Sequence, residues 1–169
     1  MLKIEKLFCN KFNKLNINNE ETLFYCGNFF IDNKKKNQKI LKKFFKENKS
    51  DLRKLDQKIN GFFAFVLIKS NSVEILTDQV RSYPIFFWWE EDKLSISNLV
   101  EKILYKKKQL NLDKNAIGEF LNLGFCIENN TIIQNLKQTS SGSFIKLKKI
   151  KNKWKIVTQI KFNSLKNFN

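Results

Sequence analysis

The stretch Thr77–Trp89, TDQVRSYPIFFWW, contains the only proline among the 169 residues. Pro84 follows an Asp-x-x-Arg pattern and precedes five consecutive apolar residues. Because the proline ring fixes φ at about −65°, it suits a turn that leads the chain into a buried strand. We expect Asp78 and Arg81 to form a hydrogen-bonded pair that orders this connection. The pattern therefore predicts a turn between two strands and a structural role for these residues.

The composition is that of a globular protein with one domain, residues 1–169. Hydrophobic residues make up 42% of the chain and aromatic residues 14%, which is enough to bury a core. No apolar run reaches the roughly 18 residues that a membrane helix needs. The N-terminal residues alternate charged and apolar side chains and show no signal-peptide core. We therefore expect a cytoplasmic protein without a membrane partner.

The charge is strongly positive, with 32 Lys and Arg against 16 Asp and Glu, a net +16. Such a charge suits binding to nucleic acid or another anionic surface. The abundance of Lys, Asn, Ile and Phe also fits the bias of an AT-rich genome. Arginine, the bidentate reader of phosphates and bases, occurs only at Arg53 and Arg81. Nucleic-acid binding is therefore an alternative and not the leading interpretation.

The chain has no histidine and three isolated cysteines, Cys9, Cys26 and Cys126. The absence of histidine excludes histidine-based metal sites and both Ser-His and Cys-His catalysis. The cysteines have no CxxC spacing. We predict neither a bound metal nor a cofactor.

Apolar patterning predicts antiparallel sheets with helices on their outer faces. The run after Asn60-Gly61 is typical of a strand buried on both faces. Two helices are expected to begin at Asn98 and Asp113, the second ending at Gly124, where a left-handed terminus suits glycine. The other expected elements are strands and turns over 1–33, a helix over 36–49, strands at 73–78, 85–89 and 93–97, and a hairpin of 141–150 with 153–162.

Four stretches in this order resemble the glutaminase half of the asparagine synthetase family, a class II amidotransferase domain with the N-terminal-nucleophile (Ntn) fold. The resemblance covers residues 60–147, and each motif is weak by itself. It implies an α+β, Ntn-hydrolase-like layered sandwich of antiparallel sheets with outer helices, shortened at its N-terminus. The stretches are Asn60-Gly61-Phe62-Phe63-Ala64-Phe65, Asp78-x-x-Arg81-x-x-Pro84-Ile85-Phe86, Ser95–Leu99, and Ile117–Gly124 followed by Thr131-Ile132 and Ser140-Ser141-Gly142-Ser143.

The same resemblance implies that the glutaminase chemistry is lost. Leu2 follows Met1, where the family has its nucleophilic cysteine. Cys26-Gly27-Asn28 stands where the family has the Asn-Gly-Glu that forms the oxyanion hole. Lys36 falls where an aspartate binds the substrate's amino group. No glycine-rich ATP loop of the family's synthetase half is present.

The leading hypothesis is a degenerate, catalytically inactive domain that is a scaffold or partner for an ATP-dependent, adenylating synthetase domain or subunit. Trp88 and Trp89 are candidates for the partner-facing surface. A first alternative is an active glutamine-dependent amidotransferase component with a displaced nucleophile, Cys9 or Cys26. A second alternative is a basic module that binds nucleic acid or an anionic surface through Lys34–Lys36, Lys42, Lys43 and the lysines of 146–155.

Overall fold

The computed structural model describes residues 3–35, 37–90, 92–151 and 153–162. These residues form two β-sheets and four helices. The helices are α1 (Gln38–Glu47), α2 (Arg53–Asp56), α3 (Val100–Leu104) and α4 (Lys114–Leu123). The strands are β1 (Lys3–Lys6), β2 (Asn13–Asn16), β3 (Thr22–Ile31), β4 (Lys34–Lys35), β5 (Ile59–Ile68), β6 (Ser72–Thr77), β7 (Phe86–Glu90), β8 (Lys93–Ser97), β9 (Leu136–Gln138), β10 (Ser143–Ile150) and β11 (Lys153–Lys161).

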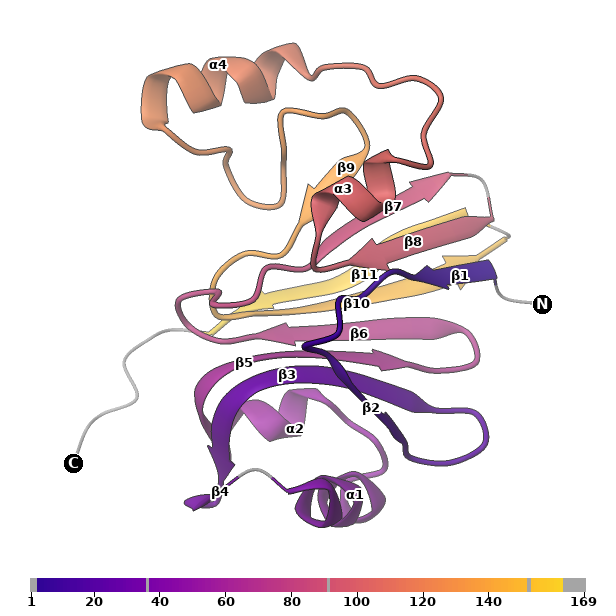
Figure 1. Cartoon of the computed structure of the whole chain (residues 1–169), viewed down its shortest axis with the longest axis vertical. Helices are drawn as coiled ribbons and strands as arrows, with labels where there is room; N and C mark the ends of the chain where they lie inside the picture. The colour runs from indigo at the N-terminus through magenta and orange to yellow at the C-terminus, as the bar shows by residue number, and fades with distance from the viewer. Residues whose placement is uncertain (1–2, 36, 91, 152, 163–169) are drawn as a thin grey trace.

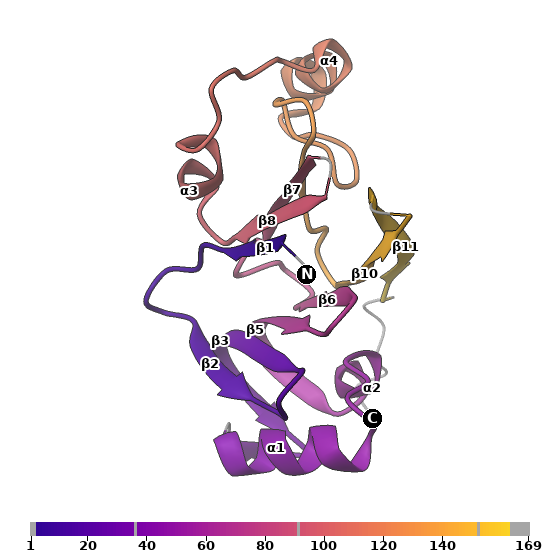
Figure 2. The ribbon, with the colours of Figure 1, turned by 90° about the vertical axis from the view of Figure 1, so that its right-hand side faces the viewer.

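The larger sheet has the strand order β11-β10-β6-β5-β3-β2, with β4 paired to β3, and its neighbours are all antiparallel. The smaller sheet has the order β1-β8-β7-β9, in which only β1 and β8 run parallel. Figures 1 and 2 show the helices α1 and α2 beyond the larger sheet and α3 and α4 beyond the smaller one.

Strand β5 shows why the sheets and helices form layers. Side chains alternate across a strand, so its apolar run supplies both faces of the larger sheet. Phe63, Phe65 and Leu67 point into the core beneath α1 and α2. Ala64 and Val66, between them, point into the core shared with the smaller sheet. The continuous apolar run of β5 is therefore buried on both faces of the larger sheet, by the helices on one side and by the smaller sheet on the other.

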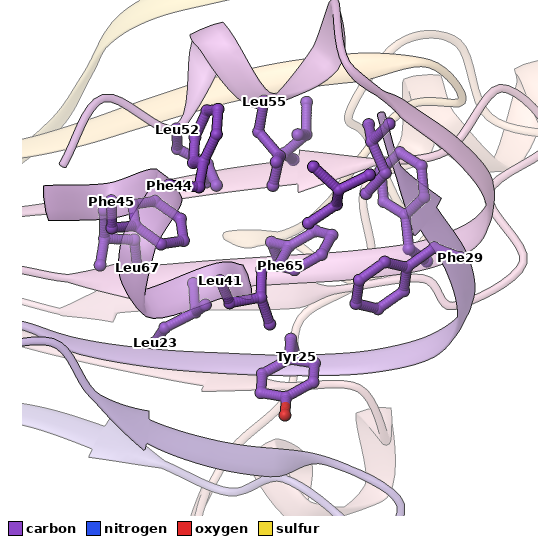
Figure 3. Packing of buried hydrophobic residues seen from close by; sticks show 14 of the residues in the cluster. Leu23, Tyr25, Phe29, Leu41, Phe44, Phe45, Leu52, Leu55, Phe65 and Leu67 are labelled. Atoms are coloured by element: carbon purple, nitrogen blue, oxygen red, sulfur yellow. The ribbon is translucent and has the colours of Figure 1, made fainter. Parts of the chain in front are cut away.

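The first core lies between α1, α2 and the larger sheet, as Figure 3 shows. Helix α1 begins at Asn37, whose side chain accepts a hydrogen bond from the Lys39 N–H at 2.8 Å. Its apolar stripe buries Leu41, Phe44 and Phe45, while its lysines face outward. The predicted amphipathic helix is confirmed.

A second core lies between the two sheets, and a third lies on the outer face of the smaller sheet beneath α3. Trp88 is buried in the third core against Ile103 and Leu136. Trp89 is partly buried against the second and stacks on Phe87, with ring centroids 5.9 Å apart. Trp88 is therefore a core residue and is not available to a partner, whereas Trp89 keeps part of its surface exposed.

The chain is thus an α+β protein built mainly of antiparallel sheets. The expected strands around the Thr77–Trp89 turn and the C-terminal hairpin are confirmed. So are the Asp113 cap and the left-handed Gly124 terminus of α4, with φ 78°. The expected cap at Asn98 is wrong: α3 begins after Leu99, and the Asn98 side chain instead contacts Cys9, 89 residues away in sequence.

Candidate functional site

The Asp78 carboxylate organises the turn that contains Pro84. It is buried and accepts hydrogen bonds from the backbone N–H groups of Phe63 at 3.0 Å, Val80 at 2.9 Å and Ser82 at 3.1 Å. The Asp78 carbonyl accepts from the Gly142 N–H at 2.8 Å. One residue therefore joins three of the stretches on which the family resemblance rests.

Arg81 and Asp78 form the expected hydrogen-bonded pair through backbone atoms, and the Arg81 side chain binds elsewhere. Its backbone N–H donates to the Asp78 carbonyl at 3.0 Å, but its Nη1 donates to Gln138 Oε1 at 3.0 Å and the Thr139 carbonyl at 2.9 Å. The guanidinium therefore joins the turn to β9 and the residue after it. The two side chains do not pair with each other, because Asp78 uses its carboxylate on backbone N–H groups.

Gly27 and Gly61 lie where β3 and β5 approach closely. Both have positive φ, 110° and 120°. A Cβ atom on Gly27 would lie 2.0 Å from the Phe62 carbonyl oxygen, and one on Gly61 would lie 2.4 Å from that of Asn28. Only glycine satisfies both the conformation and the contact. Asn60 precedes this contact on β5 and pairs with Phe30.

The structure places Cys26, Gly27 and Asn28 together in the middle of β3. The Cys26 side chain is only 1% exposed, points into the core between the sheets and lies opposite Ala64. Such a thiol is shielded from any substrate in solution. Leu2 and Lys36, the two other positions predicted to have lost the family's chemistry, lie outside the described residues.

The other two thiols differ in their surroundings. Burial alone would raise the pKa of Cys9, but hydrogen bonds from the Lys11 N–H and the Asn98 amide, with the charge of Lys102, lower it overall. The Asn98 Nδ2–Sγ distance is 3.2 Å. Burial, with the charges of Glu119 and Asp113, raises the pKa of Cys126. Cys9 is therefore the more reactive thiol of the two.

Hydroxyl groups form a buried network that the sequence did not reveal. Thr77 Oγ1 donates to the Ser140 carbonyl at 2.9 Å, and Ser143 Oγ donates to the same carbonyl at 2.7 Å. Gly142, two residues after Ser140, has a φ of 52°. Its carbonyl accepts a hydrogen bond from the Phe162 N–H at 2.7 Å. These contacts fix the 140–143 turn against the end of β6, which is a structural role.

Helix α4 stands away from the sheets in both ribbon views (Figures 1 and 2). Ala116 is its one buried residue within the described chain. Large apolar side chains along its C-terminal half and the following turn remain exposed, and we call this set the α4 surface. Its members are Phe120 at 49% exposure, Leu121 at 78%, Leu123 at 51%, Phe125 at 60% and Ile127 at 45%. The sequence predicted the two ends of this helix but not the exposure of its apolar side chains.

The lysines of the predicted basic module lie in two separate regions of the protein. Lys34 and Lys35 belong to β4, beside β3, and Lys42 and Lys43 belong to α1. The lysines of β10 and β11 lie at the opposite edge, and among them Lys146 pairs with Glu74 at 2.9 Å. This separation does not favour a single anionic-surface site.

Comparison with known proteins adds no relative. No known protein family has a sequence pattern that matches this chain, and no curated protein matches its sequence. Among the residues that the structure describes, no His, Cys, Asp and Glu side chains form a group of three that could hold a metal ion. Within the same part of the chain, no helix has the length and apolar character needed to cross a membrane.

Proposed function

We propose that this chain is a catalytically inactive, glutaminase-like domain of the asparagine synthetase type. In this role it is a cytoplasmic scaffold or partner for an ATP-dependent, adenylating synthetase domain. The proposal rests on the motif order over residues 60–147 and on the layered α+β architecture.

The burial of Cys26 supports the inactive half of the proposal. The strand position that resembles the family's oxyanion hole carries a thiol in the core between the sheets, at 1% exposure. A nucleophile must reach the substrate carbonyl, and an oxyanion donor must point at it. A side chain in the core meets neither requirement.

The α4 surface is the observation that carries the binding half. Five large apolar side chains, each at least 45% exposed, follow one another within residues 120–127. An exposed apolar patch on a protein is typical of an interaction site. A second copy of this chain is a poor occupant, because each copy carries a net charge of +16 and the two would repel. A different protein therefore fits this surface better.

The test is association with an asparagine-synthetase-type, ATP-dependent synthetase domain that lacks a glutaminase half, measured by titration calorimetry and by ammonia-dependent amide formation. We expect binding, which Leu121→Asp weakens at least tenfold because it places a charge in the apolar contact. Val157→Asp on β11, where the side chain is 42% exposed, is the matched control and leaves binding unchanged. Absence of both association and any change in synthetase activity would contradict the proposal.

A further inference from the structure

A pocket of about 420 Å³ opens between α4, α3 and the outer face of the smaller sheet. Its volume falls in the range of roughly 300–1,000 Å³ that is typical of small-molecule sites. Aromatic and aliphatic side chains form most of its wall. They include Phe86, Val100, Leu104, Phe120, Ile133 and Leu136. Such a wall suits a hydrocarbon body.

A polar pocket of about 320 Å³ adjoins the apolar one. The two share Arg81, Phe125, Cys126 and Gln138, so these residues form the boundary between them. The raised pKa of Cys126, caused by burial and then by Glu119 and Asp113, keeps its thiol neutral at pH 7. The polar pocket adds Lys161, Glu128 and the hydroxyl-bearing Ser140 and Ser141. With the cations of Arg81 and Lys161 and the one carboxylate of Glu128, the polar pocket has a net positive charge.

Arg81 holds an unusual backbone conformation at this boundary. Its φ of 55° lies in the left-handed region, which glycine adopts without strain and larger residues rarely adopt. Glu128, which lines the polar pocket, also has a positive φ, 53°. Strained backbone conformations cluster at active and ligand-binding sites. The Arg81 side chain is fixed by the hydrogen bonds from Nη1 to Gln138 and Thr139. A guanidinium has five N–H donors, so the groups other than Nη1 can bind a further acceptor.

We propose that the two pockets together bind a carboxylic acid with an apolar body. The hydrocarbon occupies the pocket beneath α4, and the carboxylate lies on Arg81 with Lys161 and the Ser141 hydroxyl nearby. The single negative charge of the carboxylate balances the net charge of +1 in the polar pocket. Phe120 and Phe125 belong both to this pocket and to the α4 surface. The two proposals are separated by Leu121, which belongs to the α4 surface and does not line the pocket.

The probes are octanoate and 1-octanol, which differ mainly in the charged head. Binding to the whole chain is followed by NMR titration of the backbone amides of residues 81–83, 85, 86 and 120–139. We expect octanoate to bind one to one and at least about tenfold more tightly than octanol, as a charge-assisted hydrogen bond predicts. Arg81→Gly removes the guanidinium and suits the left-handed backbone, so it should fold and should abolish the preference for the acid while octanol still binds.

Two further variants test the apolar wall. Phe120→Ala should weaken octanoate and octanol together, because Phe120 lines the pocket. Leu121→Ala, its neighbour at 78% exposure, should change neither affinity. Equal binding of acid and alcohol, an acid preference that survives in Arg81→Gly, or no binding of octanoate would overturn the inference. Loss of synthetase binding in Phe120→Ala without octanoate binding would instead assign this pocket to the partner.

Discussion

The buried carboxylate of Asp78 accepts a hydrogen bond from the backbone N–H of Phe63 at 3.0 Å. This contact links the turn after β6 to strand β5, which precedes β6 in the chain and pairs with it in the larger sheet. Because the same carboxylate also binds the N–H groups of Val80 and Ser82, the turn and the sheet share one acceptor. The Asp78 side chain therefore ties the first part of the Thr77–Trp89 stretch to the sheet.

Asp78→Ala should lower the free energy of unfolding by roughly 3 kcal/mol, because it leaves backbone donors without their charged acceptor. Urea unfolding at pH 7 measures the change. Glu47→Ala is the control, since Glu47 is 59% exposed and pairs only loosely with Lys43 at 3.8 Å. Its effect should stay below about 1 kcal/mol. Equal effects of the two variants would contradict the role given to Asp78.

Gly27→Ala should destabilise the protein by at least about 3 kcal/mol or prevent folding, because the new Cβ would lie 2.0 Å from the Phe62 carbonyl oxygen. Gly118→Ala is the matched control: this glycine lies within α4 and has no atom within 4 Å of the added Cβ. It should stabilise the protein by up to about 1 kcal/mol. Unfolding curves that show a tolerated Gly27→Ala would disprove the close approach of β3 and β5.

Iodoacetamide should alkylate Cys9 first, Cys126 more slowly and Cys26 only after unfolding. The order follows from the lowered pKa of Cys9, the raised pKa of Cys126 and the burial of Cys26. Mass spectrometry of the modified peptides measures each rate at pH 7. Asn98→Ala removes a hydrogen bond to the Cys9 thiolate, so it should raise the pKa of Cys9 and slow its alkylation several-fold. Rapid modification of Cys26 in the folded protein would contradict its placement in the core.

The Glu5 carboxylate should make the free energy of unfolding depend on pH. Burial alone would raise its pKa, but hydrogen bonds from Lys106, Lys93 and Ser95 outweigh burial and lower the pKa from 4.5 to about 2. A lowered pKa in the folded state stabilises the protein above pH 4.5, and this contribution is lost as the pH falls towards 2.

Glu5→Gln should therefore cost about 1 kcal/mol at pH 7, the upper end for partly exposed ion pairs. The difference from the unmodified protein should shrink between pH 4.5 and pH 2. Urea unfolding at several pH values measures it, with Glu47→Gln as an exposed control. A difference that stays constant over this range would show that the charge of Glu5 does not stabilise the fold.

The sequence predicted the elements whose patterns are local. The apolar run of β5 and the Asp113 cap of α4 are read from neighbouring residues, and both are confirmed. The short strand β9 was missed, because three residues show no clear period and its partner β7 is distant in sequence. The parallel pairing of β1 with β8 was likewise not predicted. The cap role given to Asn98 was wrong and the contact of the Arg81 guanidinium was not predicted for the same reason, since each side chain binds a partner more than 50 residues away.

The candidate site was predictable only in part. Gly27 and Gly61 belong to motifs that the sequence revealed, but their crowding across β3 and β5 is seen only in the tertiary structure. The exposure of α4 was not predictable. An apolar stripe on a helix indicates that this side is covered, but the sequence does not show which surface covers it. The boundary between the two pockets joins Arg81, Phe125 and Gln138, which only the tertiary structure brings together.

The most direct test of the proposed function is ammonia release from glutamine, measured with the purified chain alone and with an asparagine-synthetase-type synthetase domain that lacks a glutaminase half. We predict no release above the enzyme-free blank in either case, while the complex still forms. Release that disappears in Cys26→Ala or Cys9→Ala would contradict the proposed function, because the chain would then be an active amidotransferase component.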